Sequence, residues 1–141
     1  MRQTREQVET QVRERLNHGM KIIRVEDGLI FEHRNARHFL AEVDLKGSKI
    51  TVPISADFVD HPDFTDEELV DQAMKVLRPR LERYYGRGYR IREMEWQPGY
   101  QSHTYNEHQR PIFMAFVERE LADWDELFDE LPWLLEQLPE P

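Results

Sequence analysis

The sequence predicts an α+β domain with a mainly antiparallel sheet of about six strands. Three observations support this class: apolar residues recur with helical spacing near both ends and in the middle of the chain, they alternate in between, and short turn signals separate the alternating segments. The expected order is a helix, four strands, a long helix, two strands and an acidic terminal helix. Because 141 residues can bury one core, we expect a single domain over residues 1–141.

The first predicted helix begins at a capping box. Thr4 is followed three residues later by Gln7, and Val8 and Val12 then begin an apolar stripe that Gly19 can terminate. This stripe is narrow, so we expect packing against the sheet or against a second copy to hold the helix in place.

A four-stranded meander is predicted to follow. Asp27-Gly28 favours a two-residue hairpin turn after the first strand, and Gly47-Ser48 favours a turn before the fourth. Pro53 suggests that the fourth strand lies at a sheet edge or ends there, because proline cannot donate a hydrogen bond to a neighbouring strand.

The long central helix has the clearest local signals in the chain. Thr65 and Glu68 form a second capping box, and the apolar spacing from Leu69 continues through Leu77 to Leu81. Pro79 lies inside this spacing, so we predict a kinked helix over residues 65–85 and not a helix that stops at the proline.

Two further strands are expected after this helix. Residues 89–96 change their alternation near Glu93, which a β-bulge would explain, and residues 112–117 are continuously apolar, which is typical of a central strand covered on both faces. Residues 97–110 would then form a long connection, and connections of this length often have a function.

The terminal helix permits two interpretations. Trp124, Phe128 and Leu131 recur at helical spacing, and we favour a core helix on which these side chains cover the sheet. In the alternative, the same stripe binds in a groove of a partner, and the surrounding carboxylates attract a basic surface.

The last residues of the chain form a separate candidate. Pro132 is expected to end the terminal helix and to begin a short turn. Trp133 and Leu134 follow it, and an apolar cluster of this kind would mark an association site if the domain does not bury it.

The net charge of −9 is distributed in blocks. Residues 78–92 carry six arginines against one glutamate, whereas residues 118–141 carry nine acidic residues against one arginine. We expect Arg80 and Arg83 to pair with the acidic terminal helix, and the alternative is that these arginines bind a partner. Because the domain is acidic, we do not expect nucleic-acid binding.

Catalytic motifs are absent from the sequence. It has no P-loop, dinucleotide-binding, nucleophile-elbow or zinc-protease motif, so no catalytic residue, metal site or cofactor is predicted. If the chain binds a small ligand or is an enzyme, the 97–110 connection is the best candidate, since it combines rings with polar atoms at Tyr100, His103, Tyr105 and His108. The simpler interpretation is a hairpin loop whose tyrosines lie on the sheet.

The composition favours a reducing compartment. The chain has no cysteine, and its first residues lack the apolar segment of a signal peptide. We therefore expect a cytoplasmic protein that does not enter a membrane.

A small, acidic, cysteine-free domain with this element order resembles the compact bacterial secretion chaperones. This resemblance rests on element order and charge, and it implies a homodimer that binds an unfolded stretch of a client protein. Our leading hypothesis is a non-catalytic protein-interaction domain whose partner is another protein or a second copy of itself.

Overall fold

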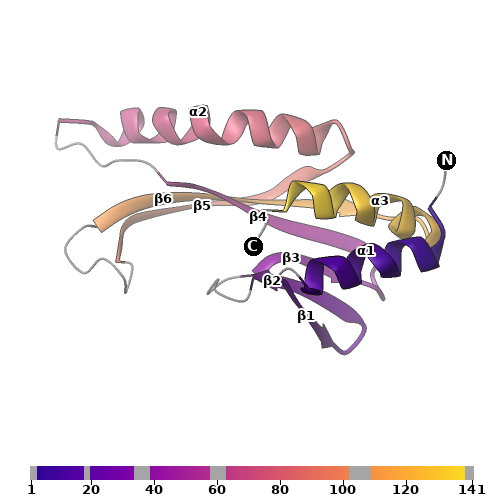
Figure 1. Ribbon diagram of the computed structural model, residues 1–141. Helices are drawn as coiled ribbons and strands as arrows, with labels where there is room; N and C mark the ends of the chain where they lie inside the picture. Colours follow the sequence, from indigo (N-terminus) through magenta and orange to yellow (C-terminus); the bar gives the residue numbers. More distant parts are fainter. Residues whose placement is uncertain (1–2, 18–19, 34–38, 58–62, 102–108, 139–141) are drawn as a thin grey trace. The chain divides into compact units, whose positions relative to one another are not determined.

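The computed structural model of the protein describes residues 3–17, 20–33, 39–57, 63–101 and 109–138 (Figure 1). In chain order its elements are α1 (Arg5–Asn17), β1 (Met20–Val25), β2 (Gly28–His33), β3 (Phe39–Asp44), β4 (Lys49–Asp57), α2 (Asp66–Tyr85), β5 (Arg90–Gln101), β6 (Gln109–Glu120) and α3 (Trp124–Gln137). This order confirms the predicted α+β class.

The strands form one antiparallel sheet in the order β1-β2-β3-β4-β6-β5. The chain also divides into two compact units, of which the first comprises residues 1–52 and 119–141 and the second residues 53–118. Strand β4 crosses the boundary between them.

The first unit has a core between its helices and the strands β1 to β4. Register places Phe31 opposite Ala41 and Val43 opposite Ile50, and all four side chains are fully buried. Helix α1 contacts both β1 and α3. Its predicted capping box is confirmed, because the backbone N–H of Gln7 donates to Thr4 Oγ1 at 3.2 Å.

The first hairpin turn differs from the prediction by one residue. Val25 pairs with Gly28, so the two turn residues are Glu26 and Asp27, and Glu26 adopts a positive φ of 51°. Gly28 is the first residue of β2. A Cβ atom there would lie 3.1 Å from the carbonyl oxygen of Val43, so a close approach of strand β3 favours glycine at this position.

The prediction that Pro53 marks an edge or an end of its strand is wrong. β4 continues to Asp57 and lies between β3 and β6. Its register with β3 covers Lys49 to Thr51, so Pro53 lies beyond the residues that pair with β3. A proline is tolerated in a central strand when its position is outside the ladder on one side.

Helix α2 belongs to the second unit and buries one face. The helix begins at Thr65, whose Oγ1 accepts from the backbone N–H of Glu68 at 3.2 Å, and it continues without interruption past Pro79. The prediction that this proline does not end the helix is confirmed. The buried side chains of α2 are those of Leu69, Ala73, Leu77, Leu81 and Tyr84.

The end of α2 uses two glycines differently. Gly86 is the C-cap in a right-handed helical conformation, whereas Gly88 has a φ of 91°, which favours glycine. Tyr89 contacts the last turn of the helix. Its backbone N–H donates to the carbonyl of Tyr84, and the two rings pack edge to face with their centres 5.1 Å apart.

Strands β5 and β6 form a long hairpin. The predicted bulge is confirmed, because the register shifts between Ile91 and Glu93. Strand β6 lies between β4 and β5, so the prediction of a central strand is confirmed. Its two faces differ, however: Phe113, Ala115 and Val117 are buried, and the alternate residues are half-buried. Complete cover on both faces is therefore wrong for this strand. Within the described helices, no segment is long and apolar enough to cross a membrane.

Candidate functional site

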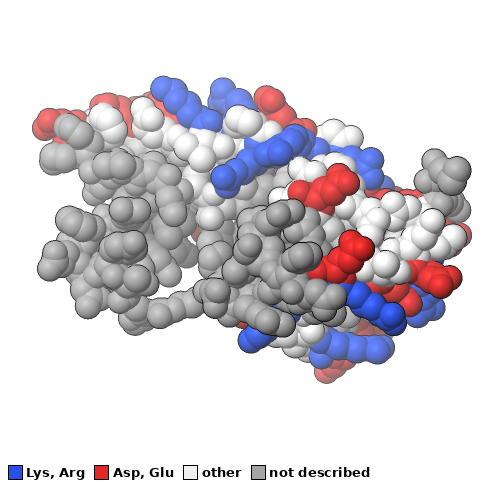
Figure 2. Space-filling view, viewed as in Figure 1, with Lys and Arg blue, Asp and Glu red and all other residues white. Residues whose placement is uncertain are grey.

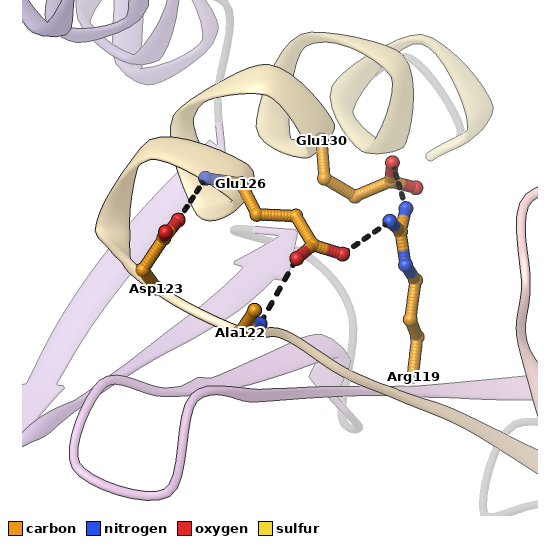
Figure 3. A network of polar contacts seen from close by, with 5 residues as sticks. All are labelled: Arg119, Ala122, Asp123, Glu126 and Glu130. Carbon is orange, nitrogen blue, oxygen red and sulfur yellow. Dashed lines mark hydrogen bonds and ion pairs between the residues drawn. The ribbon is translucent and has the colours of Figure 1, made fainter.

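Two hydrogen bonds stabilise the start of α3, one accepted by the side chain of Asp123 and one accepted by the side chain of Glu126 (Figure 3). Asp123 is the N-cap, and its Oδ1 accepts from the backbone N–H of Glu126 at 2.9 Å. The side chain of Glu126 reaches back, and its Oε2 accepts from the backbone N–H of Ala122 at 3.0 Å. Two N–H groups at the helix start are satisfied in this way, and acidic residues here also suit the helix dipole.

Arg119, at the end of β6, binds two carboxylates of α3 (Figure 3). Its Nη2 lies 2.7 Å from Glu126 Oε1, and its Nη1 is paired with Glu130 Oε2. Glu130 is only 1% exposed, so this pair lies at the edge of the core of the first unit. A buried carboxylate needs such a partner, because an uncompensated charge in the interior is costly.

The two groups facing each other have shifted pKa values. The hydrogen bond from Ala122 and then the one from Arg119 hold the pKa of Glu126 below its usual value. Burial alone would lower the pKa of Arg119, but the charge of Glu130 and the hydrogen bonds to both carboxylates raise it overall. Both groups therefore remain charged over the neutral range.

Sequence reasoning did not find this cluster, although a signal for it exists. Glu130 follows Leu127 by three residues and precedes Leu134 by four, so it lies on the same helix face as these leucines. A carboxylate on an apolar helix face indicates a buried ion pair, and Arg119 is the single basic residue between positions 118 and 141.

Helix α3 buries a different stripe from the one predicted. Trp124 is 50% exposed and Phe128 is half-buried, so within the predicted stripe Leu131 alone is buried. The buried side chains along this segment are Leu127, Glu130, Leu131, Leu134, Leu135 and Leu138.

The expected end of α3 at Pro132 is wrong, because the helix continues to Gln137. Proline costs the helix one hydrogen bond, and the burial of Leu134 and Leu135 beyond it compensates for that loss. Of the predicted terminal cluster, Leu134 is fully buried and Trp133 is half-buried.

An aromatic patch remains on the outside of this unit. The rings of Trp124 and Phe128 lie 5.9 Å apart at an angle of 39°. The guanidinium of Arg5, from α1, lies 5.9 Å from the centre of the Phe128 ring and also pairs with Glu9 at 3.1 Å. We call the surface formed by Trp124, Phe128 and Arg5 the aromatic patch.

The arginines of α2 are exposed on the second unit. Arg80 Nη1 donates to the carbonyl of Ser55 at 3.1 Å, and Arg83 is exposed beside it. Burial raises the pKa of Tyr84 to about 12, against the lowering effect of Arg83 and then Arg80. Pairing of these arginines with the terminal helix of the same chain stays a prediction.

The predicted ligand-binding connection is shorter than expected. Strands β5 and β6 extend through Gln101 and from Gln109, so residues 97–101 and 109–110 of the predicted connection belong to strands. Tyr100 pairs through its backbone with Arg110, but its side chain lies outside the described residues. His103, Tyr105 and His108 also lie outside them. Among the residues that the structure describes, no three acidic or histidine side chains are grouped to hold a metal.

Comparisons with protein-family models, with curated proteins and with solved structures found no match for this chain.

Proposed function

We propose that this chain is a cytoplasmic protein-interaction domain without catalysis and that it acts as a homodimer. The observation that carries the proposal is the exposure of Trp124. Half of this large apolar side chain is exposed, while the leucines on the next face of the same helix are buried. Exposed tryptophans beside other rings are typical anchors of protein interfaces.

The aromatic patch has the chemistry of such an anchor. Trp124 and Phe128 offer rigid apolar area, and Arg5 and Glu9 provide a polar border to it. The Arg119 cluster fixes the start of α3, the helix that carries both rings. A supported ring loses less conformational freedom on binding than a mobile side chain does.

The element order supports a form of this function in which a dimer binds a client. The order that resembles the secretion chaperones is the order of the structure, and the chain is acidic with a net charge of −9. Client binding would use apolar surface on the helices or the sheet.

Light scattering of the purified protein over a range of concentrations tests the homodimer. We expect the mass of two chains at the higher concentrations, and a monomer at every concentration would contradict this part of the proposal. A photoreactive phenylalanine analogue at position 124 tests the patch, because it should crosslink to the partner. The same analogue at Glu14, an exposed position of α1, is the control.

A thermal-shift panel of metals, nucleotides and metabolites tests the competing class of small-ligand binders. A ligand at 100 times its dissociation constant should stabilise the folded state by about 2.7 kcal/mol. We expect no such shift from any member of the panel.

A further inference from the structure

The sheet has two edges, and they differ in how they are protected against the addition of a further strand. Strand β1 lies at one edge and β5 at the other. The register of β5 shifts between Ile91 and Glu93, and the exposed charges of Arg92 and Glu93 lie at this shift. Bulges and charges of this kind prevent other chains from pairing with an edge. The register of β1 runs from Met20 to Val25 without a shift, so neither a bulge nor a proline protects this edge.

Exposed side chains lie on both sides of β1. Ile22 is opposite Phe31, which is fully buried, so Ile22 and the exposed Arg24 lie on the core side of the strand. Ile23 and Val25 lie on the other side, where they are 39% and 52% exposed. An exposed apolar edge strand is a template for pairing with another chain.

The register indicates which backbone groups of β1 face outward. In a hairpin with a two-residue turn, the pair next to the turn is hydrogen-bonded, and hydrogen-bonded and non-hydrogen-bonded pairs then alternate. Val25 pairs with Gly28 next to the turn, so Val25 and Ile23 direct their N–H and C=O groups toward β2. Ile22 and Arg24 direct theirs away from β2, and no other described strand of the chain pairs with this side of β1. A strand of another molecule can bind to these outward groups.

The charges along this segment are self-complementary. Lys21 lies near the start of β1, Glu26 and Asp27 form the turn at its end, and all three are exposed. Figure 2 shows basic and acidic side chains around the β1–β2 hairpin, at the bottom of the view. A second copy that runs antiparallel would bring its acidic turn beside Lys21 at both ends of the contact. A copy that runs parallel in the same register would place like charges together, which is costly.

We propose that β1 pairs with β1 of a second copy, antiparallel and with a two-fold axis at Ile23. This inference rests on the proposed homodimer and names its surface. Ile23 then lies opposite its own copy, and Ile22 lies opposite Arg24, so the outward groups of both strands face each other as an antiparallel ladder requires. Lys21 lies opposite Val25, so no like charges are directly opposite each other.

This contact closes on two copies. The same segment is used on both chains, and a two-fold axis uses each β1 edge once, so no β1 edge is left for a third copy. All residues of the contact belong to the first unit, so it is defined within that unit alone. The aromatic patch belongs to α1 and α3 and takes no part in the contact.

A proline substitution tests the backbone pairing. Arg24→Pro removes an outward N–H group but leaves the pairing of β1 with β2 in place, because the N–H of residue 24 does not point toward β2. Arg24→Ala is the matched control, since it removes the same side chain and retains the N–H group. Sedimentation velocity should show that Arg24→Pro self-associates about tenfold or more weakly than Arg24→Ala, because each copy loses one hydrogen bond of the contact.

A cysteine crosslink tests the position of the axis. The chain has no cysteine, so a single introduced thiol can form a disulfide only with the same position of another copy. In Ile23→Cys the opposite Cβ atoms lie about 4.5 to 5.5 Å apart across the axis, and mild oxidation should give a disulfide-linked dimer. Val25→Cys is the control. Because position 25 lies opposite position 21, its own copy is about 13 Å away along the strand, which is too far for a disulfide.

The other outcomes overturn the inference in distinguishable ways. A wild-type monomer at every concentration contradicts both the inference and the proposed homodimer. A dimer that Arg24→Pro and Arg24→Ala affect equally shows that the outward N–H group is not used, and the proposed homodimer then stands on another surface. Crosslinking of Val25→Cys as readily as of Ile23→Cys excludes a two-fold axis at Ile23.

Circular dichroism establishes that each variant is folded. If Arg24→Pro unfolds the protein, the comparison of Ile23→Cys with Val25→Cys decides the inference, because both of these variants keep every backbone N–H group.

Discussion

Helices α2 and α3 are built from the same parts, yet they present different surfaces. Each begins with a side-chain cap, at Thr65 and Asp123, and each contains an internal proline, at Pro79 and Pro132. In α2 the apolar side chains at regular spacing are the buried ones. In α3 the aromatic residues face outward and the leucines are buried.

The difference comes from the number of apolar stripes. Helix α2 has one continuous stripe, so helical spacing identifies its buried face without ambiguity. Helix α3 has aromatic residues on one flank and leucines on the next, and spacing alone does not decide between them. The buried Glu130 lies on the leucine face, and its ion pair with Arg119 accompanies the burial of that face.

The largest effect that tests this comparison is expected from core truncation. Leu134→Ala should lower the free energy of unfolding by about 3 to 4 kcal/mol, because the side chain is fully buried. Trp124→Ala should lower it by about 1 kcal/mol or less, because half of the ring is already in water. Urea denaturation of both variants measures the difference. Equal losses would show that the aromatic flank also belongs to the core.

The second-largest loss of stability is expected from breaking the ion pair between Arg119 and Glu130. Arg119→Met should cost about 2 to 3 kcal/mol, because it leaves the carboxylate of Glu130 without the arginine in a buried place. Replacing Arg119 and Glu130 together by methionine should cost less than the sum of the single changes.

The exposed pair in α1 is the control for this measurement. Arg5 and Glu9 are 72% and 52% exposed, so Arg5→Met should change the stability by less than about 0.5 kcal/mol. A strictly additive double variant at positions 119 and 130 would rule out the energetic coupling of the buried pair.

The third effect compares the two caps. Thr65→Ala and Asp123→Ala should each cost about 1 kcal/mol, since each removes the acceptor for a backbone N–H in the first turn. Asp123→Ala should have the larger effect, because it also removes a negative charge at the start of α3. Thermal unfolding of both variants ranks them, and a larger loss for Thr65→Ala would contradict the contribution of that charge.

The element order and both threonine-based helix starts could be predicted because their signals are local. A capping box, an alternating strand and a bulge are each specified by residues within a few positions of one another. The positions of Pro53 and Pro132 could not be predicted in this way. Whether a proline ends an element depends on the strand or core beside it, and that information comes from residues far away in the sequence.

The candidate site shows the same limit. The exposure of Trp124 and the pairing of Arg119 both depend on which face of α3 is buried. Residues that are neighbours in the sequence do not determine which face that is. The charge blocks were visible in the composition. Which of the acidic residues bind Arg119 could be seen only in the structure.

The smallest effect is a pH dependence at the start of α3. The folded protein holds the pKa of Glu126 below its usual value, first through the hydrogen bond from Ala122 and then through Arg119. A lowered folded pKa means that the ionised carboxylate stabilises the fold above the unfolded pKa, and that this contribution is lost as the pH falls through the folded pKa. Glu126→Gln should therefore cost about 1 kcal/mol or less near neutral pH and progressively less below about pH 4.

Urea denaturation of the wild type and of Glu126→Gln at several pH values measures this contribution. Glu136→Gln is the control on the same helix, because Glu136 is exposed near the other end of α3. If the difference between the wild type and Glu126→Gln stays constant from neutral to acidic pH, the carboxylate acts only through its shape and hydrogen bonds. A difference that shrinks with acidification shows that the charge of Glu126 stabilises the start of α3.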